Sequence, residues 1–255
     1  MTTEHPPRSQ PLRVVAALGA AVAAVRRARA VHPRGVACHA TLRITGGGDS
    51  GVDLFDRAGT YSVLVRLSRG GGLPAGWPDV LGIALRIPAA AGADGGFDLL
   101  ASTVAGAAPV ARHLPFPRRR LAAVYTTVAG YHTRRGRRYL AVLPDPASDD
   151  LGTDLARLPD VTAAGRASFR LAVASRAGRW RVVGRITLGE PLDPQPTERL
   201  SFDPVLHRLP DLRPTGLLWR IRAAAYRGSR AGRGADRPLT SLPDQEVRAD
   251  RAQHR

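Results

Sequence analysis

The sequence predicts a β-rich α+β fold in which about eight short strands close an antiparallel barrel, with helices packed outside it. Two observations predict this fold. Short runs of strand-forming residues, separated by glycine and proline turns, occur in two groups, and a segment rich in helix formers lies between the groups. A further helix-forming stretch follows the second group and closes the pattern.

The first group contains four predicted strands, at 35–46, 59–69, 79–88 and 97–103. The run at 59–69, GTYSVLVRLSR, alternates between an apolar face and a second face that carries Arg66 and Ser68. An alternating strand lines a barrel with one of its faces, so this polar pair can enter the barrel interior.

The later elements follow in order. Residues 118–158 are rich in helix formers and are broken by prolines, which predicts helices and loops. Strands are predicted again at 167–175, 179–188 and 198–204. The stretch 215–230 is helical by composition, and in it Leu218, Arg222 and Tyr226 recur at every fourth residue and so share a helix face.

Length fits one large core: 255 residues and 27.1 kDa. We predict an N-terminal arm with an alanine-rich helix at 1–28, a barrel domain at 29–237 and a mobile tail at 238–255. The apolar run at 12–25 is too short to span a membrane. We expect its helix to lie on the protein, with peripheral membrane contact as the alternative.

The net charge is +17, from 38 basic and 21 acidic residues. Every basic residue is arginine, and the arginines are spread along the chain, which indicates a coding bias more than a nucleic-acid surface. We therefore expect no specific nucleic-acid partner. The single cysteine, Cys38, excludes an internal disulfide and any site built from several cysteines, and we expect a reducing, cytoplasmic location.

Several short motifs occur in a specific order between about Arg29 and Arg233. They are RAVHPRG (29–35), VRLS (65–68), DVLGIALR (79–86), VVGRITLGEP (182–191), LSFDP (200–204) and the Arg-x-x-x-Tyr of Arg222 and Tyr226. In this order they resemble the motifs of the catalase-like superfamily of haem proteins, in its minimal barrel form. The resemblance implies a catalase-like barrel with a C-terminal haem-ligand helix and haem b as the cofactor.

On the proximal side, the resemblance implies that Tyr226 is the iron ligand, with Arg222 as its charge partner. The chemistry agrees, because a phenol with a pKa near 10 needs a metal and a nearby cation to bind as tyrosinate at neutral pH. Arg29, Arg66 and Arg233 would anchor the propionates or polarise the ligand.

On the distal side, the resemblance makes His32 the acid–base group, which moves a proton from one peroxide oxygen to the other. Ser68 would orient its ring. Catalases also place an asparagine here, and this chain contains none; FDLLAST (97–103) offers only Ser102 or Thr103, and we take Thr103 as the polar group. The implied activity is that of a peroxidase or weak catalase acting on hydrogen peroxide or organic peroxides. We expect an unnamed electron donor and a homo-oligomer.

The residues bear on three other functions. A haem-free binding protein stays open, and a protease and a metal-dependent phosphoesterase are excluded. A haem-free protein of the same fold would use Arg29, Arg66, Arg222 and Arg233 to bind a small anion. GDSG (48–51) resembles the nucleophile turn of chymotrypsin-like proteases, but no histidine lies in a fitting sequence. PDPASDD (144–150) lacks the neighbouring histidine of a metal-dependent phosphoesterase.

Overall fold

The computed structural model describes residues 34–71, 73–88, 96–193, 200, 202–204, 206–216 and 219. Its ten strands are β1 (Arg34–Ile44), β2 (Gly59–Arg69), β3 (Leu81–Ile87), β4 (Phe97–Thr103), β5 (Tyr125–Thr126), β6 (Tyr131–Thr133), β7 (Gly136–Pro144), β8 (Ser168–Ser175), β9 (Arg181–Pro191) and β10 (Arg213–Pro214). The helices described are α2 (Asp53–Asp56) and α3 (Leu158–Ala163), with short 3₁₀ turns η1 (Ala111–His113) and η2 (Leu155–Arg157).

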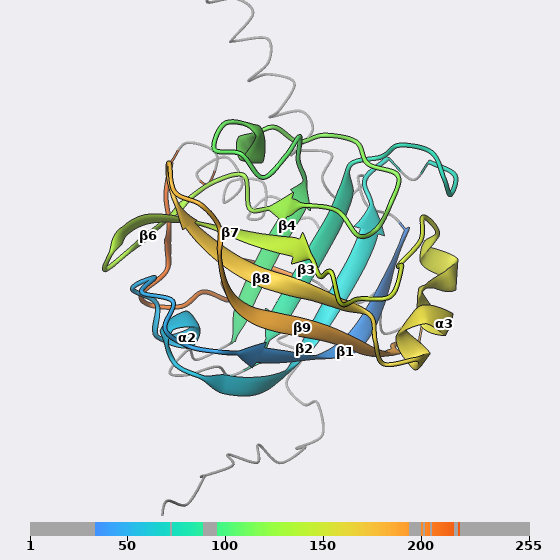
Figure 1. Cartoon of the computed structure of the whole chain (residues 1–255), viewed down its shortest axis with the longest axis horizontal. Helices are drawn as coiled ribbons and strands as arrows, with labels where there is room; N and C mark the ends of the chain where they lie inside the picture. The colour runs from blue at the N-terminus through green and yellow to red at the C-terminus, as the bar shows by residue number, and fades with distance from the viewer. Residues whose placement is uncertain are drawn as a thin grey trace, which may run out of the picture.

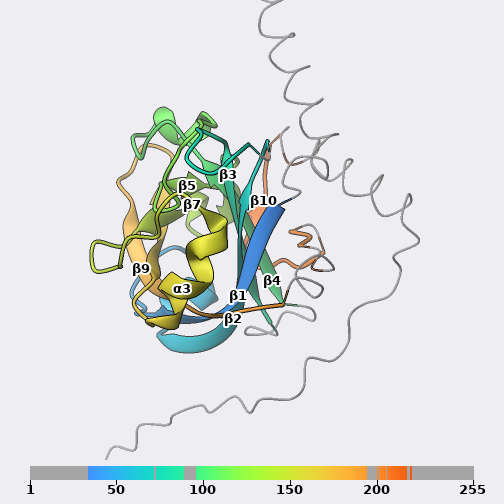
Figure 2. The ribbon, with the colours of Figure 1, turned by 90° about the vertical axis from the view of Figure 1, so that its right-hand side faces the viewer.

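Eight of these strands close a barrel (Figure 1). Each is antiparallel to its neighbour in the order β5-β4-β3-β2-β1-β9-β8, and β7 pairs with both β5 and β8 to complete the ring. The strands β6 and β10 extend the sheet beyond β7. Figure 2 shows the wall formed by β1 to β4 on one side of the barrel and β7 and β9 on the other. The predicted closed barrel is confirmed.

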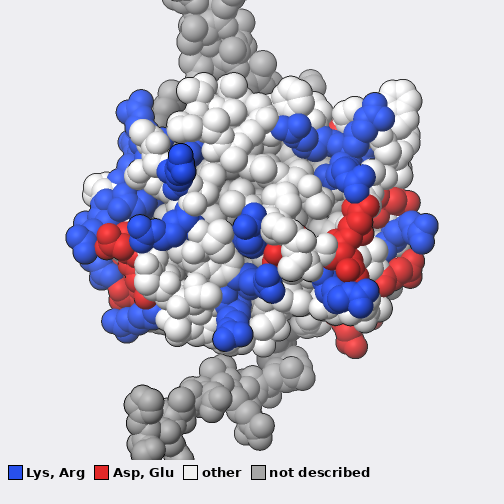
Figure 3. Space-filling model, viewed as in Figure 1, with Lys and Arg blue, Asp and Glu red and all other residues white. Residues whose placement is uncertain are grey.

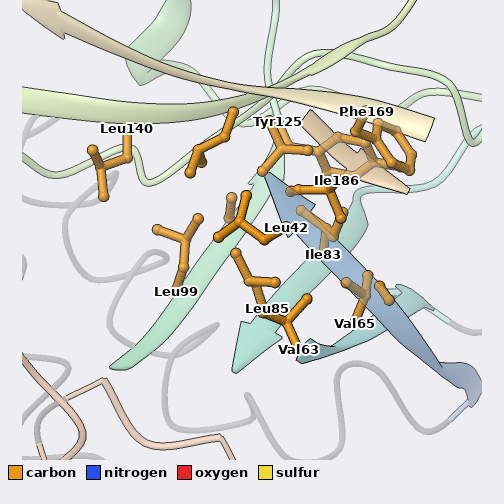
Figure 4. Packing of buried hydrophobic residues seen from close by; sticks show 14 of the residues in the cluster. Leu42, Val63, Val65, Ile83, Leu85, Leu99, Tyr125, Leu140, Phe169 and Ile186 are labelled. Atoms are coloured by element: carbon orange, nitrogen blue, oxygen red, sulfur yellow. The ribbon is translucent and has the colours of Figure 1, made fainter. Parts of the chain in front are cut away.

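The barrel interior is filled with apolar side chains from every wall (Figure 4). It contains the apolar face of β2, namely Val63, Val65 and Leu67, together with residues such as Leu42, Ile83, Leu85, Tyr125, Phe169 and Ile186. Because side chains alternate along a strand, Arg66 and Ser68 face the other way, onto the outer surface of the wall. The prediction that this polar pair enters the interior is wrong, since a dry, close-packed interior has no partner for a guanidinium.

The first four predicted strands match β1 to β4 closely, but the middle of the chain differs from the prediction. Residues 125–144 form β5, β6 and β7 in place of helices, and within 118–158 only the turn η2 and the first residue of α3 are helical. The four arginines, Leu140 and Ala141 of 134–141 favour a helix by propensity. However, β7 has β8 on one side and β5 on the other, and pairing on both edges overrides that preference.

The C-terminal part also differs from the prediction. Leu200 and residues 202–204 lie outside any strand, and β5 and β7 supply the missing members of the ring. Trp219 is buried, and its indole N–H donates a 3.1 Å hydrogen bond to the carbonyl of Gly130. The N-terminal helix, the remainder of the 215–230 helix and the C-terminal tail that the sequence predicts lie outside the described residues.

One glycine makes barrel closure possible. A Cβ atom at Gly184 of β9 would lie 2.6 Å from the carbonyl oxygen of Arg43 on β1. The two backbones approach each other here more closely than any side chain permits. Gly184, the first glycine of the VVGRITLGEP motif, therefore allows the close contact between β1 and β9.

Candidate site on the outer face of the barrel wall

A row of small residues crosses the outer face of the wall formed by β1 to β4. Cross-strand pairing sets Gly35 beside Ser68, Ser68 beside Gly82, and Gly82 beside Ser102. Paired residues on antiparallel strands point to the same face, so the four positions form one line with no side chain larger than serine. This strip is flat enough for a planar ligand to approach the sheet closely.

Arg66 lies two residues before Ser68 on β2 and on the same face as the row, and its guanidinium reaches Gly35. Its neighbours across the sheet are Ala37 and Ala84, which leave room for a long side chain. A Cβ atom at Gly35 would lie 2.6 Å from the Arg66 Cζ, so the guanidinium rests directly against the glycine backbone. Only glycine at position 35 allows this placement.

The surroundings of Arg66 favour an anionic ligand. Burial lowers the pKa of the Arg66 guanidinium from its ordinary value, although an arginine with such a shift remains charged at neutral pH. A desolvated cation gains more from a carboxylate or phosphate partner than a solvated one does. The wall therefore combines a flat strip with a fixed positive charge beside it.

Ser68 lies in the row, between Gly35 and Gly82. It is 5% exposed, and its hydroxyl donates a long hydrogen bond of 3.4 Å to the carbonyl of Gly82. A hydroxyl can also accept a hydrogen bond at its remaining lone pairs. Ser68 thus combines a polar group with the small size that the row demands.

Thr103 has a different position from the one that the distal role needs. It is fully buried and pairs with Tyr125 of the core. Its hydroxyl accepts from the amide of Leu81 at 3.0 Å and donates to the carbonyl of Phe116 at 2.8 Å. These bonds give Thr103 a structural role, whereas Ser102, the alternative hydroxyl in the same strand, lies in the row with Ser68.

A buried charge cluster flanks the same wall and was missed by sequence reasoning. Asp98 on β4 is 0% exposed and accepts hydrogen bonds of 2.8 and 2.6 Å from Arg86 on β3. It also accepts from the amide of Asp203 at 2.7 Å, and the Nδ1 atom of His207 lies 2.9 Å from it. Opposite charges at paired positions of adjacent strands were the available signal, because Arg86 and Asp98 are direct cross-strand neighbours.

This cluster fixes the LSFDP segment to the outside of the barrel. Burial raises the pKa of Asp98, but hydrogen bonds from Arg86 and His207, the charge of Arg86 and the amide of Asp203 outweigh that effect and hold the pKa below its ordinary value. The guanidinium of Arg86 also lies 5.0 Å from the centre of the Phe202 ring. Phe202, Asp203 and His207 are therefore held to β3 and β4 by a carboxylate that stays ionised.

Of the predicted site residues, the structure brings Arg66 and Ser68 together on one face. Arg29, His32, Arg222, Tyr226 and Arg233 lie outside the described residues, so their roles stay predictions. Phe116, on the segment after β4, is half-exposed, and its ring centre lies 4.9 Å from the Arg118 guanidinium.

The excluded readings gain no support from the described chain. Ser50 of the GDSG turn is buried, and its hydroxyl donates to Asp56 at 2.8 Å, as a turn-stabilising serine does. Within the described residues, no three histidine, cysteine or carboxylate side chains gather as metal ligands would. Nor does any helix in the described ranges have the length and apolar character needed to cross a bilayer.

The architecture of this chain is similar to that of solved catalase structures. No protein-family model matches the chain, and no curated protein does. Solved structures do match. One is a fungal catalase, with a TM-score of 0.60 and 15% sequence identity; the match covers 90% of this chain and 64% of that chain. A bacterial catalase matches at a TM-score of 0.62 and 15% identity, with 94% of this chain and 65% of the other covered.

The chain therefore has the catalase-like fold, as the motif order indicated. It spans slightly less than two thirds of the length of these two catalases. At this level of identity the comparison establishes the barrel and its topology, and the chemistry has to be argued from the residues themselves.

Proposed function

We propose that this protein binds haem b on the outer face of the β1–β4 wall and reduces peroxides there. The observation that carries the proposal is the Arg66 guanidinium, held against Gly35 at the edge of a flat strip of small residues, on a barrel with the catalase-like fold. A planar macrocycle with carboxylate side chains is a ligand that such a strip and such a cation fit together.

The residues present fit the cofactor in two respects. Gly35, Ser68, Gly82 and Ser102 carry no side chain large enough to hold a flat ring away from the backbone. Arg66 supplies a permanent charge for a propionate, and its partial burial strengthens that pairing. Arg29 and Arg233 are proposed as further propionate partners.

Tyr226 is proposed as the iron ligand and Arg222 as its charge partner. Tyrosinate ligation is the pattern of catalases among haem proteins. A guanidinium near the phenolic oxygen lowers the pKa of the phenol, because it stabilises the anion without competing for the metal.

His32 is proposed as the distal acid–base group, with Ser68 holding its ring by a hydrogen bond. In this role His32 would accept a proton from one peroxide oxygen and return it to the other, which would leave as water or, from an organic peroxide, as an alcohol. Bound haem supplies the redox chemistry: each peroxide takes up two electrons and two protons and yields two waters, or water and an alcohol.

Peroxide reduction with an external reductant is favoured over efficient dismutation. The chain contains no asparagine to stand beside His32. Ser102 is the hydroxyl that shares the face of Ser68, and its shorter reach gives a weaker hydrogen bond to peroxide than an asparagine amide. We therefore expect a slow peroxidase whose electrons come from an organic reductant.

The test is an absorption spectrum of the full chain produced with a haem precursor, beside Tyr226→Phe and the control Tyr61→Phe on β2. We expect a high-spin ferric spectrum that changes in Tyr226→Phe and persists in Tyr61→Phe. Peroxide consumption with a chromogenic reductant, measured on the same samples, should follow the spectrum. A wild-type protein without a Soret band after reconstitution would refute the haem proposal and leave Arg66 as part of an anion site.

A further inference from the structure

Exposed apolar side chains gather at one end of the barrel. Of the exposed large apolar residues in the described chain, five lie on the β2–β3 loop and the segment after β4, namely Leu73, Trp77, Val110, Leu114 and Phe116, and only Val182 and Leu206 lie elsewhere. Trp77 is 62% exposed and Val110 78%. These five residues are called the apolar end below; their two loops lie at the top of the barrel in Figure 1.

The two loops are joined and their backbones are fixed. Backbone hydrogen bonds of 3.0 and 2.7 Å link Asp79 of one loop with Arg118 of the other. The buried side chain of Arg69 donates to the carbonyls of Leu73 and Trp77, and Arg118 donates to the carbonyls of Val104 and Ala105. These hydrogen bonds order the backbone of both loops, so the exposed apolar side chains have defined positions on the surface.

Basic side chains predominate around the apolar end. No acidic residue occurs in 104–120, and Asp79 is buried beside Arg69. Arg119 and Arg120 are exposed three and four residues after Phe116, and Arg120 forms an ion pair with the exposed Asp150. The β8–β9 turn, held by Arg112 through the carbonyls of Ser175 and Gly178, adds the exposed Arg176 and Arg179. Figure 3 shows uncharged surface with basic side chains beside it at the upper right, and acidic side chains below them.

A partner for this surface must accept apolar side chains and carry negative charge. A second copy of the chain meeting through the same patch would bring like charges together, which is unfavourable. An anionic lipid bilayer provides both properties, because tryptophan and phenylalanine partition into the interfacial region while arginines pair with the headgroups.

We propose that the apolar end inserts into the surface of an anionic bilayer, with Trp77 and Phe116 as anchors and Arg119 on the headgroups. The inference does not depend on haem binding. It assigns the membrane contact to two loops of the barrel and not to the N-terminal run.

The test is co-sedimentation of the full chain with vesicles of phosphatidylcholine alone and with added phosphatidylglycerol. The variants are Trp77→Ser and Arg119→Glu. Their matched controls are Leu206→Ser, which is 59% exposed near the opposite end of β4, and Arg43→Glu near the far end of β1. All four positions are exposed, so folding should survive, and circular dichroism checks this.

We expect binding to anionic vesicles and little to neutral ones. Arg119→Glu should weaken binding at least fivefold, roughly the factor that one basic residue near an anionic surface contributes, and Trp77→Ser should weaken it by a similar factor. The two controls should bind as the wild type does. Absence of binding to anionic vesicles, or equal binding by all the variants, would overturn the proposal; equal binding would assign any membrane affinity to another part of the chain.

Discussion

At the scale of single residues, glycine is needed at positions 35 and 184 for different physical reasons. A Cβ at Gly184 would meet the backbone oxygen of Arg43, which is fixed in the sheet, whereas a Cβ at Gly35 would meet the end of the flexible Arg66 side chain. Gly184→Ala should lower the free energy of unfolding by about 1–3 kcal/mol, the usual cost of overpacking. Gly35→Ala should change stability by less than about 1 kcal/mol, but should displace the guanidinium and weaken haem binding.

Urea denaturation and haemin titration of the two variants separate these effects. Stability should change in Gly184→Ala alone, and haem affinity should fall most in Gly35→Ala. Equal haem affinity in Gly35→Ala and the wild type would contradict the role given to Arg66.

The two neighbouring hydroxyls of β4 should also differ. Thr103→Val removes the partner of the Leu81 amide and the Phe116 carbonyl, which should lower the free energy of unfolding by about 1–3 kcal/mol, the cost of an unsatisfied buried group. Ser102→Ala should leave stability nearly unchanged and slow peroxide turnover. Thermal melts and peroxidase assays of both variants check this; turnover slowed by Thr103→Val and unchanged in Ser102→Ala would contradict it.

The sequence located Arg66 and Ser68 correctly on one strand face, but assigned that face to the interior. Alternation defines which residues share a face; it does not say which face is inside. Which face of β2 points inward depends on the side chains that the other strands place in the barrel. The apolar faces of β3, β4 and β9 pack more densely with Val63, Val65 and Leu67 than they could with Arg66 and Ser68.

At the scale of elements, Asp98 holds the 202–207 segment against the wall. Asp98→Asn would leave Arg86 without its carboxylate, and breaking a buried ion pair costs about 3–5 kcal/mol. We expect that loss of unfolding free energy, together with faster proteolysis after residue 200, since the Asp203 amide loses a charged acceptor. Limited proteolysis with mass mapping measures the second effect, and unchanged cleavage would contradict the docking role.

The same carboxylate gives a pH dependence. The pKa of Asp98 is lower in the folded protein than in the unfolded chain, so its contribution is fully present above the ordinary carboxyl pKa of about 4 and disappears as pH falls through the lower folded value. The wild type should lose more unfolding free energy than Asp98→Asn between about pH 5 and pH 2. Parallel urea titrations across this range check the difference; identical slopes would be inconsistent with it.

Element prediction succeeded where one face of a strand was clearly apolar, as in β2, β3 and β8. It failed at β5 to β7, because short strands such as Tyr125–Thr126 carry too few residues for a period to be visible. Their conformation is set by pairing with β4 and β8, residues distant in the sequence.

At the scale of the whole molecule, the barrel encloses the chain's only cysteine. Cys38 is 0% exposed, and burial raises the pKa of its thiol to about 12. Because the thiolate is the reactive form, Cys38 should resist thiol reagents in the folded state and react when the barrel opens. Labelling with a chromogenic disulfide should follow the urea unfolding curve, whereas rapid labelling in native buffer would show that β1 leaves the barrel easily.

The central claim is that haem binds the outer face of the β1–β4 wall. The most direct measurement is a haemin titration of the wild type, Arg66→Ala and the control Arg43→Ala, followed at the Soret band. We predict saturation at one haem per chain, affinity at least tenfold weaker in Arg66→Ala, the scale of one charge-assisted pair of about 1.5–3 kcal/mol, and no change in Arg43→Ala. Equal affinity in all three proteins would contradict the placement of the site, and no saturable binding would contradict the haem proposal itself.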